Sequence, residues 1–522
     1  MEKAKRKHAP APNYVSPNQF TLDCFKTPFE RELNPKNRWV VLAGLIPWDE
    51  ICALYLKNVG SSSTGRPPLN PRIVIGSLII KHMCNLDDRE AVDQMTENIY
   101  MQFFLGYSSF TSEPPFDASL FVDFRKRLGV DSINAINEKI AELKTNLESE
   151  NKTTTITTTS DSKDSDNTID GNPPEIQNKG RIIFDATACP QDIAYPTDLD
   201  LLSDAREKSE QLIDKLYDQG MHEKKPRTYR EVARKRYLKT AQKKNKSHKE
   251  IHKAVGSQLR FLKRNLNSIN KLLDSYKSIP LKPKNYKYLL VINTFYAQQK
   301  EMYDNQVHRI EDRIVSIHQP HVRPIVRGKS QAKVEFGAKI HVSLIDGISF
   351  LDELSWDAFN EGSHMMDYVE RYRGRFGCYP RELLADQIYC TRANRAALKE
   401  KGIKLLAKPL GRPSAVQQHV SPGERNPIEG KFGQAKTAYG LNRVKARLRG
   451  TSESWIACII LVLNLVKLAG AALPSLIFKI AKSFSASWLI RSVSHYVEGN
   501  PKRLSCSTVF FNSGHVDLKY VA

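Results

Sequence analysis

Hydrophobic residues recur at helical spacing through the first third of the chain. The segment PRIVIGSLIIKHMCNL (71–86) predicts one helix, and DDREAVDQMTENIYMQFFLGY (87–107) predicts a second. A third, short helix is predicted over FDASLFVDFRKRLG (116–129), where Gly129 ends it. We therefore predict a compact all-helical domain over residues 35–148. The pattern leaves open whether this domain reads duplex DNA or is a plain helical interaction domain.

From about residue 181 the pattern becomes that of strands. In RIIFDATACP (181–190) the apolar run Ile182 to Phe184 predicts a first strand that ends at Asp185, and alternating residues on both sides of the two-residue turn Asp346-Gly347 predict a hairpin. Short strands are also predicted at RELLAD (381–386) and KLLAK (404–408). Helical patterns separate these strands. We therefore predict an α/β fold with a mixed sheet, flanking helices and a helical insertion after the first strand.

Composition divides the chain further. Residues 149–178 are rich in Thr, Ser and Asp, which is typical of a flexible linker. The apolar run at 455–474 approaches the length of a membrane span, but Asn464 and Lys467 interrupt it, which favours a buried core helix. The predicted segments are a disordered basic arm at 1–34, the helical domain at 35–148, the linker at 149–180, the α/β domain at 181–480 with its insertion at about 200–318, and a C-terminal tail at 481–522.

The charge balance indicates a polyanionic partner. The chain of 522 residues has 79 Lys and Arg against 57 Asp and Glu, a formal net charge of +22. Nucleic acid is the first expectation and an anionic membrane surface the second. Residues 221–270 are especially basic and predict either a nucleic-acid contact surface or a solvated helix face. Eight scattered cysteines without a CxxC pair, and an N-terminus without an apolar signal segment, predict a reduced cytoplasmic protein.

Three carboxylates stand where they could carry out chemistry. Asp185 and Asp386 each follow an apolar strand, and polar residues at strand ends project into ligand crevices. Taken singly, such an Asp is usually a turn former or a helix cap. Glu429 lies in RNPIEGKFGQAK (425–436), where Asn426 could be an N-cap and Glu429 the partner that completes a capping box. The sequence therefore leaves a cap and a metal ligand as alternatives for Glu429.

Phosphodiester displacement gives the three carboxylates a common purpose. Two Mg²⁺ ions about 4 Å apart can activate a nucleophile and stabilise a leaving oxygen, and Mg²⁺ prefers oxygen ligands. On this hypothesis Asp185 bridges both ions, while Asp386 and Glu429 each hold one. Arg425 and Lys436, which flank Glu429, would neutralise phosphate charge.

The sequence resembles the DDE transposases of bacterial insertion sequences, in the group related to insertion-sequence families four and five. The resemblance lies in IIFDATACPQDIAYPTDLDLLSDAREKSEQLID (182–214), in LLADQIYCTRANRAALKEKGI (383–403) and in RNPIEGKFGQAKTAYGLNRVKARLRG (425–450). Asp185 and Asp386 match the family's first two catalytic carboxylates. The third stretch matches the family pattern Tyr-x2-Arg-x3-Glu-x6-Lys, except that Pro422 replaces the tyrosine. Further similar stretches, such as RPPLNPRIVIGSLIIKHM, extend the resemblance over most of residues 40–470.

This resemblance implies an RNase H-like catalytic core with Mg²⁺, or Mn²⁺ in its place. It implies cleavage of double-stranded DNA at transposon ends and transfer of the 3′-OH to target DNA, by a homodimer or larger assembly on paired ends. A bacterial cytoplasmic, nucleoid-associated protein without a membrane partner is expected. The residues expected to contact DNA are Arg125, Lys126, Arg127, Arg323, Arg327, Lys329 and Lys431.

Three rival functions remain open at this point. An RNase H-fold nuclease would cut DNA without joining it, and a transposon-derived DNA-binding protein would do neither. An RNA-binding protein rests on charge alone. Among other residues, His318 and His321 form an HxxH pair without further ligands nearby, and Trp356 is a core aromatic or a base-stacking residue. At most one of the adjacent Asp352 and Glu353 can point inward from their predicted strand.

Overall fold

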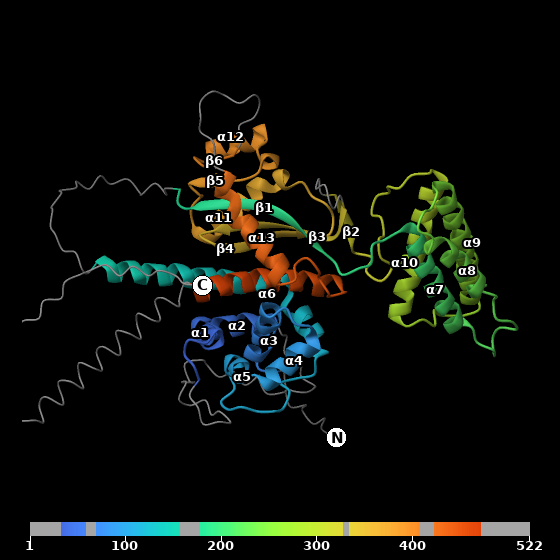
Figure 1. The fold of residues 1–522 in the computed structure, drawn as a ribbon, viewed down its shortest axis with the longest axis horizontal. Helices are drawn as coiled ribbons and strands as arrows, with labels where there is room; N and C mark the ends of the chain where they lie inside the picture. The colour runs from blue at the N-terminus through green and yellow to red at the C-terminus, as the bar shows by residue number, and fades with distance from the viewer. Residues whose placement is uncertain (1–32, 59–68, 157–177, 327–333, 408–421, 471–522) are drawn as a thin grey trace, which may run out of the picture. The chain divides into compact units, whose positions relative to one another are not determined.

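The computed structural model describes residues 33–58, 69–156, 178–326, 334–407 and 422–470 (Figure 1). The predicted basic arm lies outside these residues except for its last two positions. Most of the predicted linker and the whole C-terminal tail from residue 481 also lie outside them.

The N-terminal region is helical, as predicted. Its helices are α1 (Arg38–Leu45), α2 (Trp48–Asn58), α3 (Pro71–Met83), α4 (Asp88–Glu97), α5 (Ile99–Leu105) and α6 (Leu120–Ile156). The single helix predicted over 87–107 is wrong, because Asn98 ends α4 and caps α5 by accepting hydrogen bonds from two backbone N–H groups. Gly129 interrupts α6 with a left-handed φ of 61°, but helix resumes beyond it. The boundary predicted at residue 148 therefore falls within a helix.

The predicted mixed sheet is confirmed. Its strands are β1 (Arg181–Pro190), β2 (Arg323–Val326), β3 (Val334–Ile345), β4 (Ile348–Ser355), β5 (Glu382–Leu384) and β6 (Lys404–Leu406). Strand β1 pairs antiparallel with β3 and parallel with β5, which pairs parallel with β6. The hairpin of β3 and β4 turns at Asp346 and Gly347, both with positive φ, as the sequence predicts. Strand β2, which also pairs with β3, was not predicted.

The two faces of the sheet pack against different helices. On one face, Ile182 and Phe184 lie in a core with residues of α11 (Met365–Phe376) and α12 (Arg392–Glu400). On the other face, Ile183, Val342 and Leu384 belong to a larger core. This larger core includes buried residues of α13 (Asn426–Ala438) and of the N-terminal helices. The helices of the N-terminal region and the sheet therefore share one hydrophobic core.

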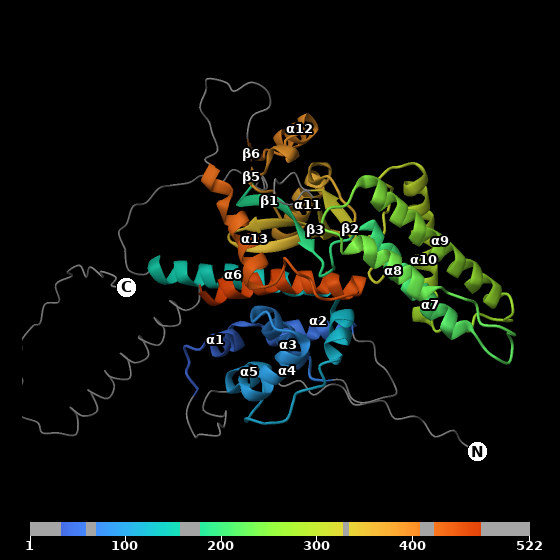
Figure 2. The ribbon, with the colours of Figure 1, turned by 45° about the vertical axis from the view of Figure 1, so that its right-hand side comes forward.

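A helix at Arg449–Gly470 joins these two parts (Figures 1 and 2). Its Asn464 donates a hydrogen bond to Asn137 of α6 (2.6 Å) and accepts one from the Ser349 backbone N–H of β4 (2.8 Å). Within the described residues this helix has the length and hydropathy of a membrane span, and most of it is buried in the fold. The prediction of a buried core helix is confirmed as far as Gly470.

The predicted insertion follows β1 and forms its own helical bundle. Its helices are α7 (Asp198–Leu216), α8 (Arg230–Ala241), α9 (His248–Leu273) and α10 (Pro283–Asp304). Thr197 caps α7 by accepting a hydrogen bond from the Asp200 backbone N–H. Apolar residues of α7, α9 and α10 fill a core separate from that of the sheet.

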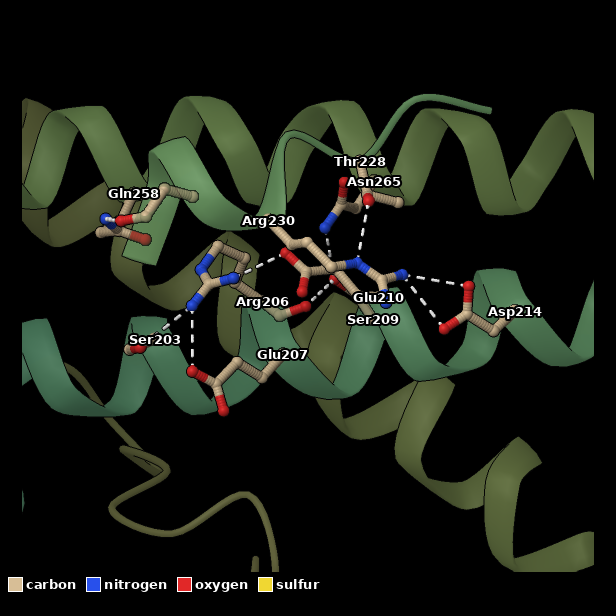
Figure 3. A network of polar contacts seen from close by, with 11 residues as sticks. Ser203, Arg206, Glu207, Ser209, Glu210, Asp214, Thr228, Arg230, Gln258 and Asn265 are labelled. Carbon is tan, nitrogen blue, oxygen red and sulfur yellow. Dashed lines mark hydrogen bonds and ion pairs between the residues drawn. The ribbon is translucent and has the colours of Figure 1, made fainter. Parts of the chain in front are cut away.

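A polar network lies inside this bundle (Figure 3). The guanidinium of Arg206 is almost fully buried and lies 2.6 Å from the Glu210 carboxylate, which is itself buried. Asn265 of α9 donates a hydrogen bond to the Ser209 hydroxyl of α7 (2.9 Å). Because buried polar groups must be paired, these contacts fix how α7 and α9 face each other.

Candidate active site

Asp185 lies in the middle of β1 on the sheet face that α13 covers. The prediction that it ends its strand is wrong, because β1 continues to Pro190 through its pairing with β3. The Ala186 backbone N–H donates a hydrogen bond to the Asp185 carboxylate (2.8 Å). Burial raises the pKa of Asp185, and the nearby negative charges of Asp386 and Glu429 raise it further. The Ala186 N–H and the Arg425 guanidinium offset only part of this rise in pKa.

Asp386 follows β5, the parallel neighbour of β1. It lies two residues beyond Leu384 and caps the short 3₁₀ helix η4 (Gln387–Tyr389), whose first backbone N–H donates to its carboxylate (2.8 Å). Because β5 is parallel to β1 and adjacent to it, Asp386 comes close to Asp185. The side chain of Asp386 is 60% exposed, so solvent and ligands can reach it.

Arg425 brings the two aspartates together. It ends the 3₁₀ helix η5 (Pro422–Arg425), directly before α13. Its guanidinium nitrogens lie 3.2 Å from a carboxylate oxygen of Asp386 and 3.6 Å from one of Asp185. One positive group therefore serves two negative ones, which leaves the site with an excess of carboxylate charge.

Glu429 is presented by α13 and is not part of a capping box. The residue at the N-cap of α13 is Arg425, and no side chain caps the helix. The predicted cap at Asn426 is therefore wrong, because Asn426 is already helical. Buried Ile428 anchors the first turn in the large core, and the neighbouring Glu429 is exposed. The charge of Glu429 contributes to the raised pKa of Asp185.

Two lysines of α13 have different surroundings. Lys436 is half-buried two turns after Glu429. Lys431 donates a hydrogen bond to the Leu463 carbonyl (3.4 Å), and burial together with Lys467 and Lys144 lowers its pKa to about 8. Lys431 therefore lies against the helix Arg449–Gly470, which does not favour the DNA contact predicted for it.

The oxygen donors fit a hard divalent cation. Carboxylate oxygens are the ligands that Mg²⁺ and Mn²⁺ prefer. In the part of the chain that the structure describes, no three Asp, Glu, His or Cys side chains are close enough to form a metal cluster. The Arg425 guanidinium instead provides the positive charge between Asp185 and Asp386. The carboxylates of Asp185 and Asp386 thus already bind one cation, and their oxygen atoms are donors of the kind that suits Mg²⁺ or Mn²⁺.

The residues predicted to contact DNA are not equivalent. Arg125 is buried, and its guanidinium forms two hydrogen bonds with the Asp88 carboxylate (2.8 and 2.9 Å). Its predicted DNA contact is therefore wrong, because the side chain is a structural one. Lys126 and Arg127 are exposed, as a DNA contact requires. Arg323 is partly exposed on β2.

Two predicted DNA contacts, Arg327 and Lys329, lie outside the residues that the structure describes. Trp356 is buried beside His321, as a core aromatic. The other member of the HxxH pair, His318, forms a hydrogen bond with the Tyr288 hydroxyl instead of sharing a ligand site with His321.

Two buried polar groups around the sheet were missed or only partly foreseen. Tyr389 follows Asp386 by three residues, and its buried hydroxyl has no hydrogen-bond partner among the described residues. Burial raises its pKa, and the charges of Glu361 and Asp185 add to the effect. Of the adjacent residues Asp352 and Glu353, Asp352 points inward, and its carboxylate lies 2.8 Å from the Arg375 guanidinium. The only sequence signal for Tyr389 was an aromatic residue three positions after Asp386.

Comparisons with known proteins give a consistent result. The family described as "Transposase DDE domain" matches residues 383–466, and "Transposase domain (DUF772)" matches residues 27–127. The first match includes Asp386, Arg425 and Glu429 but not Asp185. The chain is also 31% identical over 185 residues to the uncharacterized protein ORF8 in the nfe locus of Rhizobium meliloti, which covers 35% of this chain and 75% of the relative. No solved structure matches the chain.

Proposed function

Because this chain belongs to the DDE transposases, we propose that it cuts DNA at the ends of a mobile element and joins the freed 3′ ends to target DNA. The enzyme class and its DNA substrate follow from the family. The residues, the metal and the joining step are the substance of the proposal. We also propose that the sheet is an RNase H-like catalytic core.

The ion pairs of Arg425 carry this proposal. A single guanidinium lies within 3.6 Å of both Asp185 and Asp386. The charge of Glu429 acts on the carboxylate of Asp185. Asp185, Asp386 and Glu429 would hold Mg²⁺, or Mn²⁺ in its place. When bound, the metal supplies Lewis-acid stabilisation of the attacking and leaving oxygens.

Arg425 and Lys436 would bind the phosphate oxygens around the scissile bond. Arginine is suited to this role because its planar donors match a phosphate in two places at once. When the carboxylates are engaged elsewhere, the Arg425 guanidinium is released to pair with the DNA. The proposed contact therefore replaces the ion pairs that Arg425 forms in the structure.

The reaction has two steps at one site. A water molecule loses a proton, its oxygen forms a bond to phosphorus, and the bond from that phosphorus to the terminal 3′ oxygen of the element breaks, which leaves a 5′-phosphate on the flanking strand. The 3′ oxygen takes up a proton and becomes a 3′-OH. In the second step this hydroxyl loses its proton and bonds to a target phosphorus, while the target's own P–O3′ bond breaks. No covalent bond to the protein is required.

The assembly and location of the enzyme are part of the proposal. Two element ends must be processed together, so a homodimer or larger assembly on paired ends is expected. The DNA substrate places the protein in the bacterial cytoplasm, at the nucleoid.

The test is cleavage and joining of a labelled duplex that carries the element's own ends, with Mg²⁺ present. Wild type is compared with Glu429→Gln, and Glu400→Gln on the exposed part of α12 is the matched control. Gln keeps the shape of Glu but lacks the charge that would hold a cation. We expect wild type and Glu400→Gln to cut and join, and Glu429→Gln to bind the duplex without cutting it.

The other outcomes separate the rivals. Cutting without joined products would support a nuclease, and binding without cutting by wild type would support a non-catalytic DNA-binding protein. Equal activity of Glu429→Gln and wild type would remove Glu429 from the site.

A further inference from the structure

A pocket lies away from the three carboxylates. It has a volume of about 400 Å³ and is bounded by α10, by residues 317–320 and by residues 447–448. This volume falls in the range of roughly 300–1,000 Å³ that is typical of small-ligand sites. It lies where the insertion meets the segment that precedes β2 and the segment that follows α13.

The rim of this pocket is positively charged. Lys284, Lys287 and Arg447 line it and are exposed, and none of the three side chains forms an ion pair or hydrogen bond with another described residue. The residues that line the pocket include no Asp or Glu. Lys208 lies beside them, and its pKa is lowered by burial and by the charges of Lys215 and Lys284. The lining thus carries cations and no anion, while Asp204 outside the pocket interacts electrostatically with His318.

The interior of the pocket is apolar and aromatic. Tyr288, Val291, Ile317 and Leu448 line it, and Leu448 is 49% exposed. The Tyr288 hydroxyl is fixed by a hydrogen bond with His318 (3.0 Å), so the ring is held in place. A positively charged rim over a fixed aromatic ring is the combination with which proteins bind unpaired nucleotides.

A row of exposed cations leads from the pocket to the strand that carries Asp185. Arg443, Lys445 and Arg447 are exposed, while the alternate residues Val444 and Ala446 are buried. Backbone hydrogen bonds tie Val444 to Pro190 and Asp192 at the end of β1 (2.9 and 3.0 Å). The row is therefore pinned to β1, and a nucleic-acid strand following it would reach the pocket.

We infer that this pocket binds one unpaired nucleotide of a DNA strand, with its phosphates at Lys284, Lys287 and Arg447 and its base against Tyr288. The inference rests on the proposed function, because that function supplies DNA as the occupant. It assigns a role to α10 of the insertion, which the catalytic carboxylates leave unexplained.

The test measures binding without catalysis. The full chain is titrated, in EDTA, into a fluorescein-labelled oligothymidylate of about 15 nucleotides and into a labelled duplex of the same length, and fluorescence anisotropy gives both affinities. The variants are Lys287→Gln/Arg447→Gln, Tyr288→Leu and Tyr288→Phe. Lys399→Gln/Lys404→Gln, two exposed lysines of α12 and β6, is the control for lost charge.

We expect both Tyr288→Leu and the pocket double variant to weaken single-strand binding by about fivefold or more. Tyr288→Phe, which keeps the ring, should stay within about twofold of wild type, as should the Lys399/Lys404 control. Duplex affinity should change no more in the pocket variants than in the control. A 5-iodo-deoxyuridine in the oligonucleotide should crosslink to Tyr288 under ultraviolet light.

Either of two results would overturn the inference. One is single-strand affinity of the pocket variants equal to that of the control, with no crosslink at Tyr288. The other is an equal loss of duplex and single-strand affinity, which would make the rim a duplex backbone contact. Because this binding assay contains EDTA, it does not depend on catalysis. A chain that binds single strands here but does not cut DNA in the Mg²⁺ assay would refute the proposed catalysis and leave this inference standing.

Discussion

The guanidinium of Arg425 lies 3.2 Å from the carboxylate of Asp386, and it reaches Asp185 with its other terminal nitrogen. Two of the three proposed metal ligands are thus already engaged by a cation of the protein. A metal ion that binds there must compete with Arg425, and DNA phosphate can relieve the competition by taking the guanidinium away. Metal and DNA binding are therefore expected to support each other.

Replacing Arg425 should strengthen metal binding in the absence of DNA. Arg425→Gln removes the competing positive charge, and we expect Mn²⁺ affinity to rise about three- to tenfold, a modest gain because solvent screens the site. Titration followed by electron paramagnetic resonance of free Mn²⁺ measures this. Arg443→Gln, which removes an exposed arginine paired with Asp192, is the control. Unchanged or weaker affinity of Arg425→Gln would contradict the competition.

Glu429→Gln should leave stability nearly unchanged. Because no side chain caps α13 and Glu429 is exposed, the change should alter the free energy of unfolding by less than about 0.5 kcal/mol. Urea unfolding followed by circular dichroism measures the difference. Because Gln can also complete a capping box, Glu429→Ala is the variant that tests the cap. A loss of about 1 kcal/mol in Glu429→Ala, the usual cost of a removed cap, would favour a capping role.

Asp88→Asn should destabilise the N-terminal helices. Asp88 lies 2.9 Å from the Lys81 ammonium and 2.8 Å from the Arg125 guanidinium, and both cations are buried. Removing the carboxylate charge leaves two buried cations uncompensated, so we expect a loss of about 3 kcal/mol or more in the free energy of unfolding. Asp123→Asn, which breaks the exposed pair with Lys126, should cost less than about 0.5 kcal/mol. Equal effects of the two variants in urea unfolding would refute this difference.

Asp88 should also make the free energy of unfolding depend on pH. Burial raises the pKa of Asp88, but Arg125 and Lys81 outweigh this effect and lower the pKa to about 2. A pKa lowered by folding contributes stability above the unfolded value of about 3.9, and this contribution is lost as pH falls towards 2. We expect roughly 2 kcal/mol to disappear over this window in wild type. Urea unfolding at pH 5, 4 and 3 should show a shallower decline in Asp88→Asn; parallel declines would contradict the assignment.

Removing one member of the buried Arg206–Glu210 pair should destabilise the insertion more than removing both members. Glu210→Ala leaves the Arg206 guanidinium buried without its closest partner, and we expect a loss of about 3–5 kcal/mol in the insertion. Arg206→Met/Glu210→Leu removes both charges and should recover most of that loss. Hydrogen exchange of the α7 and α9 amides measures the local effect. A double variant as unstable as the single one would mean that the network (Figure 3) depends on the pair itself.

Local patterns predicted most of the fold. The turn at Asp346-Gly347 and the helix over 71–86 depend on neighbouring residues, and both are confirmed. The shared core was not predictable, because it pairs helices of the N-terminal region with a helix more than three hundred residues later. Strand β2 was missed for a similar reason, since four residues become a strand only through pairing with β3.

The candidate site was predicted in its residue types but not in its geometry. Strand-end position suggested Asp185, yet the residue lies within β1, and only the pairing with β3 extends the strand past it. The cap predicted at Asn426 depended on where α13 begins, and the preceding 3₁₀ turn moves that start. Arg125 looked like a surface cation, because sequence does not reveal that Asp88 and the core enclose it.

The helix Arg449–Gly470 also sets the order in which the protein can mature during synthesis. Ile140 and Trp455 belong to one core, but the ribosome makes them more than three hundred residues apart. At about 5–20 residues per second, this separation corresponds to roughly 15–60 s. During this interval the apolar faces of the N-terminal helices have no partner from the C-terminal part of the chain. Shielding by chaperones should therefore matter most before residue 470 emerges, and a chain released before that point would lack the helix that closes its core.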